Sequence, residues 1–448
     1  MSFPRGFEWG VAAASYQIEG GYDEDGKGLS IWDVFSHIPG KIISDDNGDV
    51  ACDHYHRYRE DIAIIKELGI KHYRMSFAWP RIFPNGDTVI NDDGVRFYDD
   101  LINELLDNGI TPHITLYHWD LPQALEDKGG WLNRDITDMF AYYAAFVVKH
   151  FSDRVTSFFT INEPQCIAKL GYQIGIHAPG KVSTGAYQVL KVYHHLALAH
   201  GKAVTAMRKE AVQPVKIGFA STGRLCYPKE GTDEDIKLSE KLSFQIDEEG
   251  YAFNHATFCD EVVFGKYPDL KDMLKEMPAD YVLEGDLEIC SPKIDFIGVN
   301  IYNGTEVSVK VSDYYVPKDI GMPRTSLKWP ITPKVMNWGI RHICNRYKLP
   351  IIISEDGLAC NDKIYLDGKV HDLDRIDFLE RYLAELQLAM EAGADVRGYF
   401  HWSLTDNYEW NAGYSDRFGL VYIDYPTQKR ILKDSAYWYK NYVEQNTN

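Results

Sequence analysis

Eight short apolar or alternating runs recur along the chain, and amphipathic stretches separate them. Such runs predict buried strands, and apolar residues at helical spacing predict helices between them. The predicted strands span residues 7–15, 73–79, 111–119, 157–163, 216–222, 295–302, 350–355 and 396–404. The predicted helices span residues 53–68, 94–108, 136–150, 187–208, 334–347 and 374–392. About eight alternations of strand and helix are typical of a closed (β/α)8 barrel, and a doubly wound open sheet is the competing fold.

The ends of the predicted strands favour the barrel. In a barrel, the C-terminal ends of all strands meet at one mouth, where barrel enzymes carry their chemistry. Polar and aromatic side chains stand at or near these ends in this chain: Gln17, His118, Trp119, Asn162, Glu163, Asn300, Tyr302, Glu355 and Trp402. No Gly/Ser linker or charge run divides the sequence, and α/β barrels can remain single domains at this length. We therefore predict an α/β fold, one (β/α)8 TIM barrel catalytic domain over residues 1–448, with the active site at the C-terminal ends of the strands.

The net charge argues against nucleic acid and anionic lipid as partners. The 47 basic and 66 acidic residues give a formal net charge of -19, which repels nucleic acid and anionic lipid. Aromatic residues make up 13% of the chain, and most of them are explained by a large core. We expect small-molecule partners, no nucleic acid and no membrane, and the charge leaves the oligomeric state open.

Motifs and cysteines narrow the function further. The N-terminus lacks the basic and apolar segments of a secretion signal, and no apolar stretch is long enough to span a bilayer. The seven cysteines are scattered without a CxxC pair, so we expect free thiols in a cytoplasmic enzyme. GxGxxG, GxxxxGK[ST] and HExxH motifs do not occur, which favours a hydrolase that needs no cofactor and no metal.

Two glutamates end strongly apolar strands. Glu163 lies between Asn162 and Pro164, and Glu355 follows a run of isoleucines. One such acid could be exposed or cap a turn, but two at different strand ends fit the paired carboxylates of glycoside hydrolysis. Partial desolvation raises the pKa of a carboxyl group, which suits Glu163 as a proton donor at neutral pH.

An attacking carboxylate must stay ionised, so Glu355 needs a cation and hydrogen-bond donors beside it. Arg74 on the second strand and Tyr302 after the sixth are the candidates. A structural ion pair within the barrel explains Arg74 equally well, and the two roles are compatible.

Four motifs, in order along nearly the whole chain, resemble those of glycoside hydrolase family 1. They are the opening segment FEWGVAAASYQIEG, the acid/base motif TINEP, the nucleophile motif SEDG and the sugar-binding segment HWSLTDNYEW. Any one of them is weak evidence, but their joint occurrence is highly specific.

The resemblance assigns roles to individual residues. It implies a general acid/base at Glu163, a nucleophile at Glu355, and supporting roles for Arg74, Asn162 and Tyr302. The residues that it implies for sugar binding are Gln17, His118, Trp119, Asn162, Asn300, Trp402, Glu409, Trp410 and Phe418. Trp329 is expected to meet the leaving group, and His177 is a second candidate there, although loop histidines are often simply solvated.

Asp356 departs from the family pattern, which usually has asparagine after the nucleophile. A second acid beside Glu355 would raise the pKa of the nucleophile if both pointed inward. We expect Asp356 to turn away from the site.

The reaction implied is a double displacement with net retention, in which Glu355 attacks the anomeric carbon while Glu163 protonates the leaving oxygen. It predicts carboxyl groups about 5 to 5.5 Å apart. The expected substrates are terminal β-D-glucosyl residues of cellobiose-like and aryl β-glucosides, as in cellulose degradation, with β-galactosides and β-fucosides as side activities.

Two alternatives remain open at this stage. A 6-phospho-β-glucosidase would share the motifs, although Glu409 and Trp410 stand in the form that the family uses for neutral sugars. A carbohydrate-binding barrel that has lost turnover would usually lack one of the two carboxylates, and both are present.

Overall fold

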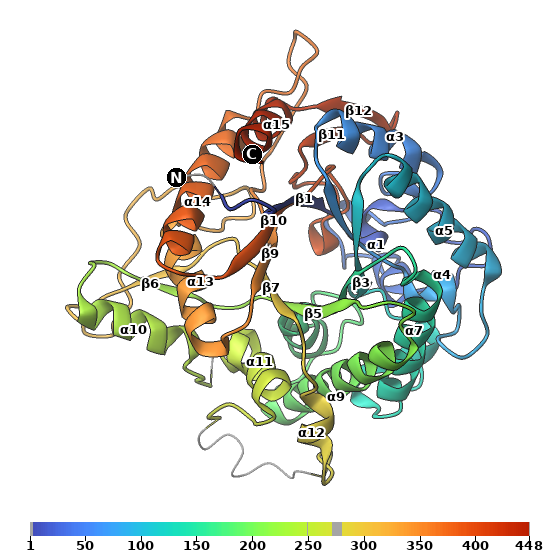
Figure 1. Cartoon of the computed structure of the whole chain (residues 1–448), viewed down its shortest axis with the longest axis horizontal. Coiled ribbons are helices and arrows are strands. Elements are labelled where there is room, and N and C mark those ends of the chain that lie inside the picture. The colour runs from blue at the N-terminus through green and yellow to red at the C-terminus, as the bar shows by residue number, and fades with distance from the viewer. Residues whose placement is uncertain (1–2, 249, 271–279, 448) are drawn as a thin grey trace.

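The computed structural model describes residues 3–248, 250–270 and 280–447. Eight parallel strands close into a barrel in the order β1-β10-β9-β7-β5-β4-β3-β2 (Figure 1). The barrel strands are β1 (Glu8–Ala12), β2 (His72–Ser76), β3 (Thr111–Tyr117), β4 (Ser157–Asn162), β5 (Lys216–Ser221), β7 (Phe296–Asn300), β9 (Ile351–Asp356) and β10 (Val396–Trp402). Each lies in one of the eight predicted runs within a residue or so, which confirms the barrel and excludes the open sheet.

Helices surround the barrel (Figure 1). The six predicted helices are confirmed as α3 (His54–Glu67), α5 (Asp92–Asp107), α7 (Ile136–Phe151), α9 (Ala186–Glu210), α13 (Lys334–Tyr347) and α14 (Leu373–Glu391). Helix α3 ends as expected before Gly69, whose φ of +70° lies in the left-handed region that favours glycine.

Shorter elements fill the connections. The remaining α-helices are α1 (Ser15–Ile18), α2 (Ile31–Ser36), α4 (Trp79–Ile82), α6 (Gln123–Glu126), α8 (Pro164–Cys166), α10 (Asp233–Phe244), α11 (His255–Phe264), α12 (Asp286–Cys290) and α15 (Asp434–Asn446). Other helical turns are η1 (Ile43–Asp45), η2 (Gly130–Leu132), η3 (Ile167–Ile174), η4 (Tyr251–Phe253) and η6 (Trp410–Ala412). Strands β6 (Cys226–Pro228) and β8 (Thr305–Val307) form one small sheet, and β11 (Val421–Asp424) and β12 (Lys429–Leu432) form another.

Side chains from several strands fill the interior of the barrel. Phe159, Phe296, Ile352 and Phe400 are buried in one apolar cluster, which also includes Trp402 beyond them. Strands β4 and β9 are buried along their whole length, as expected for parallel strands covered by helices. This packed interior forms a rigid floor beneath the C-terminal ends of the strands.

The barrel closes between β1 and β10, which come from opposite ends of the chain. Five residue pairs join these strands, from Glu8 with Gly398 to Ala12 with Trp402. Tyr439 of α15 donates a hydrogen bond of 2.9 Å to the carbonyl oxygen of Gly10. The last helix therefore fastens the first strand.

The described residues bear on two further expectations, which concern membrane spans and cysteines. In the described part of the chain, no helix has both the length and the apolar character needed to cross a bilayer. All seven cysteines are free, as expected from their scattered positions.

Candidate active site

A pocket of about 580 Å³ opens at the C-terminal ends of the barrel strands. Its lining includes most of the predicted site residues: His118, Trp119, Glu163, His177, Asn300, Tyr302, Trp329, Glu355, Trp402, Glu409, Trp410 and Phe418. Gln17, Arg74 and Asn162 do not line the pocket, but they are buried and contact residues close to it. Residues spread over four hundred positions are thus brought to one mouth.

Glu163 is placed by the turn that ends β4. Its φ is +47°, and Pro164 begins helix α8 directly after it, so the strand cannot continue. The backbone N–H of Glu163 donates to the carbonyl oxygen of Ala220 at 2.9 Å, which ties the turn to β5. Its side chain is buried and accepts a hydrogen bond of 2.8 Å from Nδ2 of Asn300.

Glu355 on β9 receives the cation that the sequence suggested. Nη1 of Arg74 lies 2.6 Å from its Oε1, and the hydroxyl of Tyr302 donates to its Oε2 at 2.8 Å. Arg74 and Glu355 are both almost completely buried. Burial raises the pKa of Glu355, while Arg74 and Tyr302 act in the opposite direction by stabilising the carboxylate.

No described residue provides Glu163 with such a cation contact. Burial first, and then the charge of Glu355, raise its pKa to about 7, although hydrogen bonds from Cys166 and Asn300 lower it. When two carboxyl groups lie close together and only one of them contacts a cation, the proton that they share stays on the other group. The geometry therefore favours a protonated Glu163 beside an ionised Glu355.

The side-chain amide of Asn162 links Arg74, Asn300 and His118. Its Oδ1 accepts hydrogen bonds from Nη2 of Arg74 at 2.7 Å and from Nδ2 of Asn300 at 3.1 Å. Its Nδ2 must then be the donor to Nε2 of His118, at 3.0 Å. This contact leaves the proton of the neutral imidazole on Nδ1 of His118, where it is available to a ligand.

Among the predicted sugar-binding residues, three buried polar atoms have no hydrogen-bond partner within the described part of the chain. They are Oε1 of Gln17, Nδ1 of His118 and Oε2 of Glu409. Burial, and then the charges of Asp416 and the two other glutamates, raise the pKa of Glu409 to about 8. Buried polar atoms are rarely left unsatisfied, so this part of the pocket suits a ligand with several hydroxyl groups.

Aromatic rings form the walls around these polar atoms. Trp410 lies 4.5 Å from Trp119 and 4.6 Å from Trp32, measured between ring centroids. His177 contacts Trp119 and Trp32 and is only 8% exposed, so it supports the tryptophans instead of being solvated. Such rings can cover the apolar face of a sugar while the polar atoms bind its edge.

Three residues of this site have strained backbone conformations. Trp119, Glu163 and Trp410 have φ values of +81°, +47° and +48°, in the region that non-glycine residues seldom adopt. Residues held in such conformations cluster at functional sites, where the surrounding structure enforces them.

Trp329, predicted to meet a leaving group, lines the same pocket. Its ring contacts Tyr302 and Phe418 at centroid distances of 5.3 and 6.2 Å. Since Tyr302 also holds Glu355, this aromatic group links Trp329 to the reacting centre.

Asp356 turns away from the site, as predicted. Its Oδ2 accepts a hydrogen bond of 2.8 Å from the hydroxyl of Tyr399, which packs against Trp9 outside the barrel interior. The register between β7 and β9 shifts at Ser354, so Ser354 and Glu355 both face the interior of the barrel and Asp356 is the next side chain to point outward.

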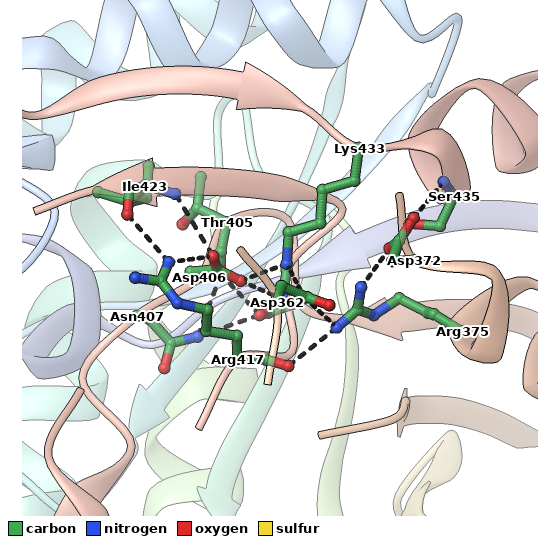
Figure 2. Close-up of polar contacts among 12 residues, drawn as sticks. Asp362, Asp372, Arg375, Thr405, Asp406, Asn407, Arg417, Ile423, Lys433 and Ser435 are labelled. Atoms are coloured by element: carbon green, nitrogen blue, oxygen red, sulfur yellow. Dashed lines mark hydrogen bonds and ion pairs between the residues drawn. The ribbon is translucent and has the colours of Figure 1, made fainter. Parts of the chain in front are cut away.

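A buried charge network supports the loop after β10 (Figure 2). Asp406 accepts from Lys433 and Arg417, each at 2.6 Å, and from the backbone N–H of Gly419 at 3.1 Å. Residues 403–419 carry Glu409, Trp410 and Phe418, so these contacts determine where that wall of the pocket stands.

The same network reaches the connection between β9 and α14. Lys433 donates to Asp362 at 2.5 Å, and Arg375 contacts Asp362 at 2.8 Å and also Asp372 (Figure 2). Lys433, Arg375 and Asp406 are fully buried, and three cations balance three carboxylates. The loops that follow the strands of Glu355 and Trp402 are thereby fastened together.

Within the described residues, two groups of side chains could supply metal ligands, and neither lines the pocket. Glu8, His72 and His113 lie at the N-terminal ends of strands, and His194, Glu261 and Cys290 lie between helices. Both ring nitrogens of His194 already bind carboxylates, Glu261 at 2.7 Å and Asp286 at 2.9 Å, so hydrogen bonding explains the second group.

The model of glycosyl hydrolase family 1 matches residues 1–448. The chain belongs to this family. It is 44% identical over 454 residues to beta-glucosidase A of Thermotoga maritima, which covers 99% of this chain and 98% of that protein. Beta-glucosidase A of Acetivibrio thermocellus is also 44% identical over 454 residues, with 100% and 99% covered. A solved structure of the Thermotoga maritima beta-glucosidase in complex with glucoimidazole matches with a TM-score of 0.90 at 42% identity, covering 100% of this chain and 99% of that one.

Family motifs did not identify every residue of the pocket. Cys166, Lys169, Arg224 and Phe253 also line it, on the side of β4 and β5. They lie in connecting segments without a strand-end pattern or a motif, so only the folded chain brings them to the family 1 site.

The charge network generates a test of stability. Lys433→Met removes one buried cation and leaves Asp362 and Asp406 short of a partner, which should cost about 3 to 5 kcal/mol in the free energy of unfolding. Urea unfolding followed by tryptophan fluorescence measures this loss. Lys237→Met on α10 removes an exposed lysine and should change stability by less than about 0.5 kcal/mol. Equal stability of the two variants would contradict the role given to the network.

Proposed function

We propose that this family 1 protein is a retaining exo-acting β-glucosidase that hydrolyses terminal non-reducing β-D-glucosyl residues. The observation that carries the proposal is the pair of buried carboxyl groups, of which Glu355 contacts Arg74 at 2.6 Å and Glu163 contacts only neutral donors. One carboxylate is thus prepared to attack, and one carboxyl group is prepared to donate a proton.

In the first half of the reaction, an oxygen of Glu355 attacks the anomeric carbon while Glu163 donates its proton to the leaving oxygen. Tyr302 holds the other carboxylate oxygen of Glu355, which keeps the nucleophile oriented. In the second half, ionised Glu163 removes a proton from water as the water attacks the glycosyl-enzyme. The two inversions give net retention.

The polar end of the pocket supports a neutral glucosyl unit. Gln17, His118 and Glu409 present unpartnered polar atoms to the sugar hydroxyls, and Trp402 and Trp410 cover its faces. A 6-phosphate would bring negative charge toward the ionised Glu355 and the acidic side chain of Glu409, which disfavours the 6-phospho-β-glucosidase alternative. A carboxylate can bind hydroxyls of different epimers, so β-galactosides and β-fucosides are proposed as side substrates.

Further proposals concern the setting of the enzyme. Seven free cysteines suit a reducing cytoplasm, where cellobiose-like sugars from cellulose degradation would be the substrates. The shared barrel and the contact of Tyr439 with Gly10 support one catalytic domain over the whole chain.

Parallel assays of three substrates test the function. We expect rapid hydrolysis of p-nitrophenyl β-D-glucopyranoside, slower hydrolysis of the β-galactoside and very slow hydrolysis of the glucoside 6-phosphate. Proton NMR should show that β-glucose is released first, because two inversions retain the configuration. Activity on the phosphate alone would favour a phosphoglycosidase, and inactivity toward all three would favour a binding protein.

Substitution of the carboxylates tests their roles. Glu355→Ala should lower kcat by at least about 10⁴-fold, because the covalent route is lost. Added azide should restore part of the activity and give the α-glucosyl azide. Near-normal turnover of Glu355→Ala without azide would exclude it as the nucleophile.

The pH profile tests Glu163. Since the active form has a protonated Glu163 and its pKa is raised to about 7, kcat/KM should fall as the pH rises above about 7. Glu163→Gln cannot lose this proton, so its residual activity on 2,4-dinitrophenyl β-D-glucopyranoside should lack the alkaline limb. An unchanged alkaline limb in this variant would assign the titration to another group, such as Glu409.

A further inference from the structure

Two cations share the side of the pocket formed by β4 and β5. Lys169 lies in η3, six residues after Glu163, and Arg224 follows β5. Both residues are partly buried, and both line the cavity that contains Glu163 and Glu355. No family motif includes either residue.

The two cations are incompletely neutralised. Arg224 forms an ion pair of 3.1 Å with Asp247 and donates to the carbonyl oxygen of Gln245, but its Nε is buried without a hydrogen-bond partner among the described residues. Lys169 forms no hydrogen bond or ion pair with any described residue, and its Nζ lies 5.2 Å from the ring centroid of Phe253. Burial, and also the charge of Arg224, lower the pKa of Lys169.

The position of these cations relates them to the leaving group. Glu163 protonates the leaving oxygen, so the aglycone lies on the side of the pocket where Glu163 stands. Lys169 and Arg224 occupy that side, on segments after β4 and β5. Glu409 and Trp410, which suit the glucosyl unit, belong to the loop after β10. In one direction around the barrel, strand β10 is separated from β4 by β1, β2 and β3.

The side chains near the two cations indicate what kind of group the rest of the aglycone should be. Phe253 lies against Lys169, and Trp329, Leu170 and Ile176 line the same pocket. These side chains favour a flat, apolar group, whereas the cations favour a negative charge at its edge.

We propose that the aglycone subsite selects β-glucosides whose aglycone is an aromatic acid, with its carboxylate held by Lys169 and Arg224. This inference rests on the β-glucosidase function proposed above. The carboxylate supplies the partner that Lys169 lacks and gives the buried Nε of Arg224 an acceptor. A charge-assisted contact in a partly desolvated pocket is stronger than one at a free surface.

The test compares 4-carboxyphenyl and 4-carbamoylphenyl β-D-glucopyranoside. These glucosides have nearly the same shape, and the neutral carbamoyl group withdraws electrons more strongly, so leaving-group ability alone favours the amide. The wild-type protein should have the higher kcat/KM on the carboxylate, mainly through a lower KM. Lys169→Met should lower the ratio of the two kcat/KM values about tenfold, with little change for the amide.

Three controls separate the outcomes. Lys169→Arg should keep the carboxylate preference, and added salt should weaken it in the wild-type protein. Lys293→Met removes an exposed lysine just before β7, at the opposite end of the barrel, and should leave the ratio unchanged. If both glucosides were hydrolysed and the ratio of their kcat/KM values were the same in the wild-type protein and in Lys169→Met, the inference would be overturned. Failure to hydrolyse either glucoside, or the p-nitrophenyl glucoside, would instead overturn the proposed function.

Discussion

The buried ion pair between Arg74 and Glu355 is the interaction on which the rest of the site depends. A lone charge inside a barrel would be very costly, so each group requires the other. Arg74 also binds Oδ1 of Asn162, and through this amide it determines the orientation of Asn300 and the protonation of His118. One cation on β2 thereby sets the ionisation and geometry of residues from three other barrel strands and the loop after β3.

The barrel holds this centre rigidly, while the sugar-binding wall needs separate support. Asp406 and Lys433 provide it with fully buried charges that connect the loop after β10 to the connection after β9. Substrate recognition and nucleophile placement therefore share one scaffold, although the residues involved lie far apart in the sequence. On the side proposed for the aglycone, the described residues form no such balanced network around Lys169 and Arg224, which leaves charge for the ligand proposed there.

The eight strands could be predicted because each is a short apolar run, and the carboxylates because each stands where such a run ends. The outward direction of Asp356 was expected, but the register shift that turns both Ser354 and Glu355 inward appears only in the folded barrel. The contacts among the site residues could be anticipated only in part. Tyr302 and Arg74 were candidates, but the amide of Asn300 reaching Glu163, and the support of Trp410 by His177, depend on distances between separate loops.

Local pattern alone determined the strand and helix order, the strand-end positions of both glutamates and, through four motifs, the family. These features follow from hydrophobic periodicity and from motifs contained within a few residues. The tertiary structure alone decided that Asn300 reaches Glu163, how Asp406 supports the sugar-binding loop and that Lys169 and Arg224 line the same pocket. Charges and hydrogen bonds act over a few ångströms in space, and closing the barrel is what brings distant segments within that range.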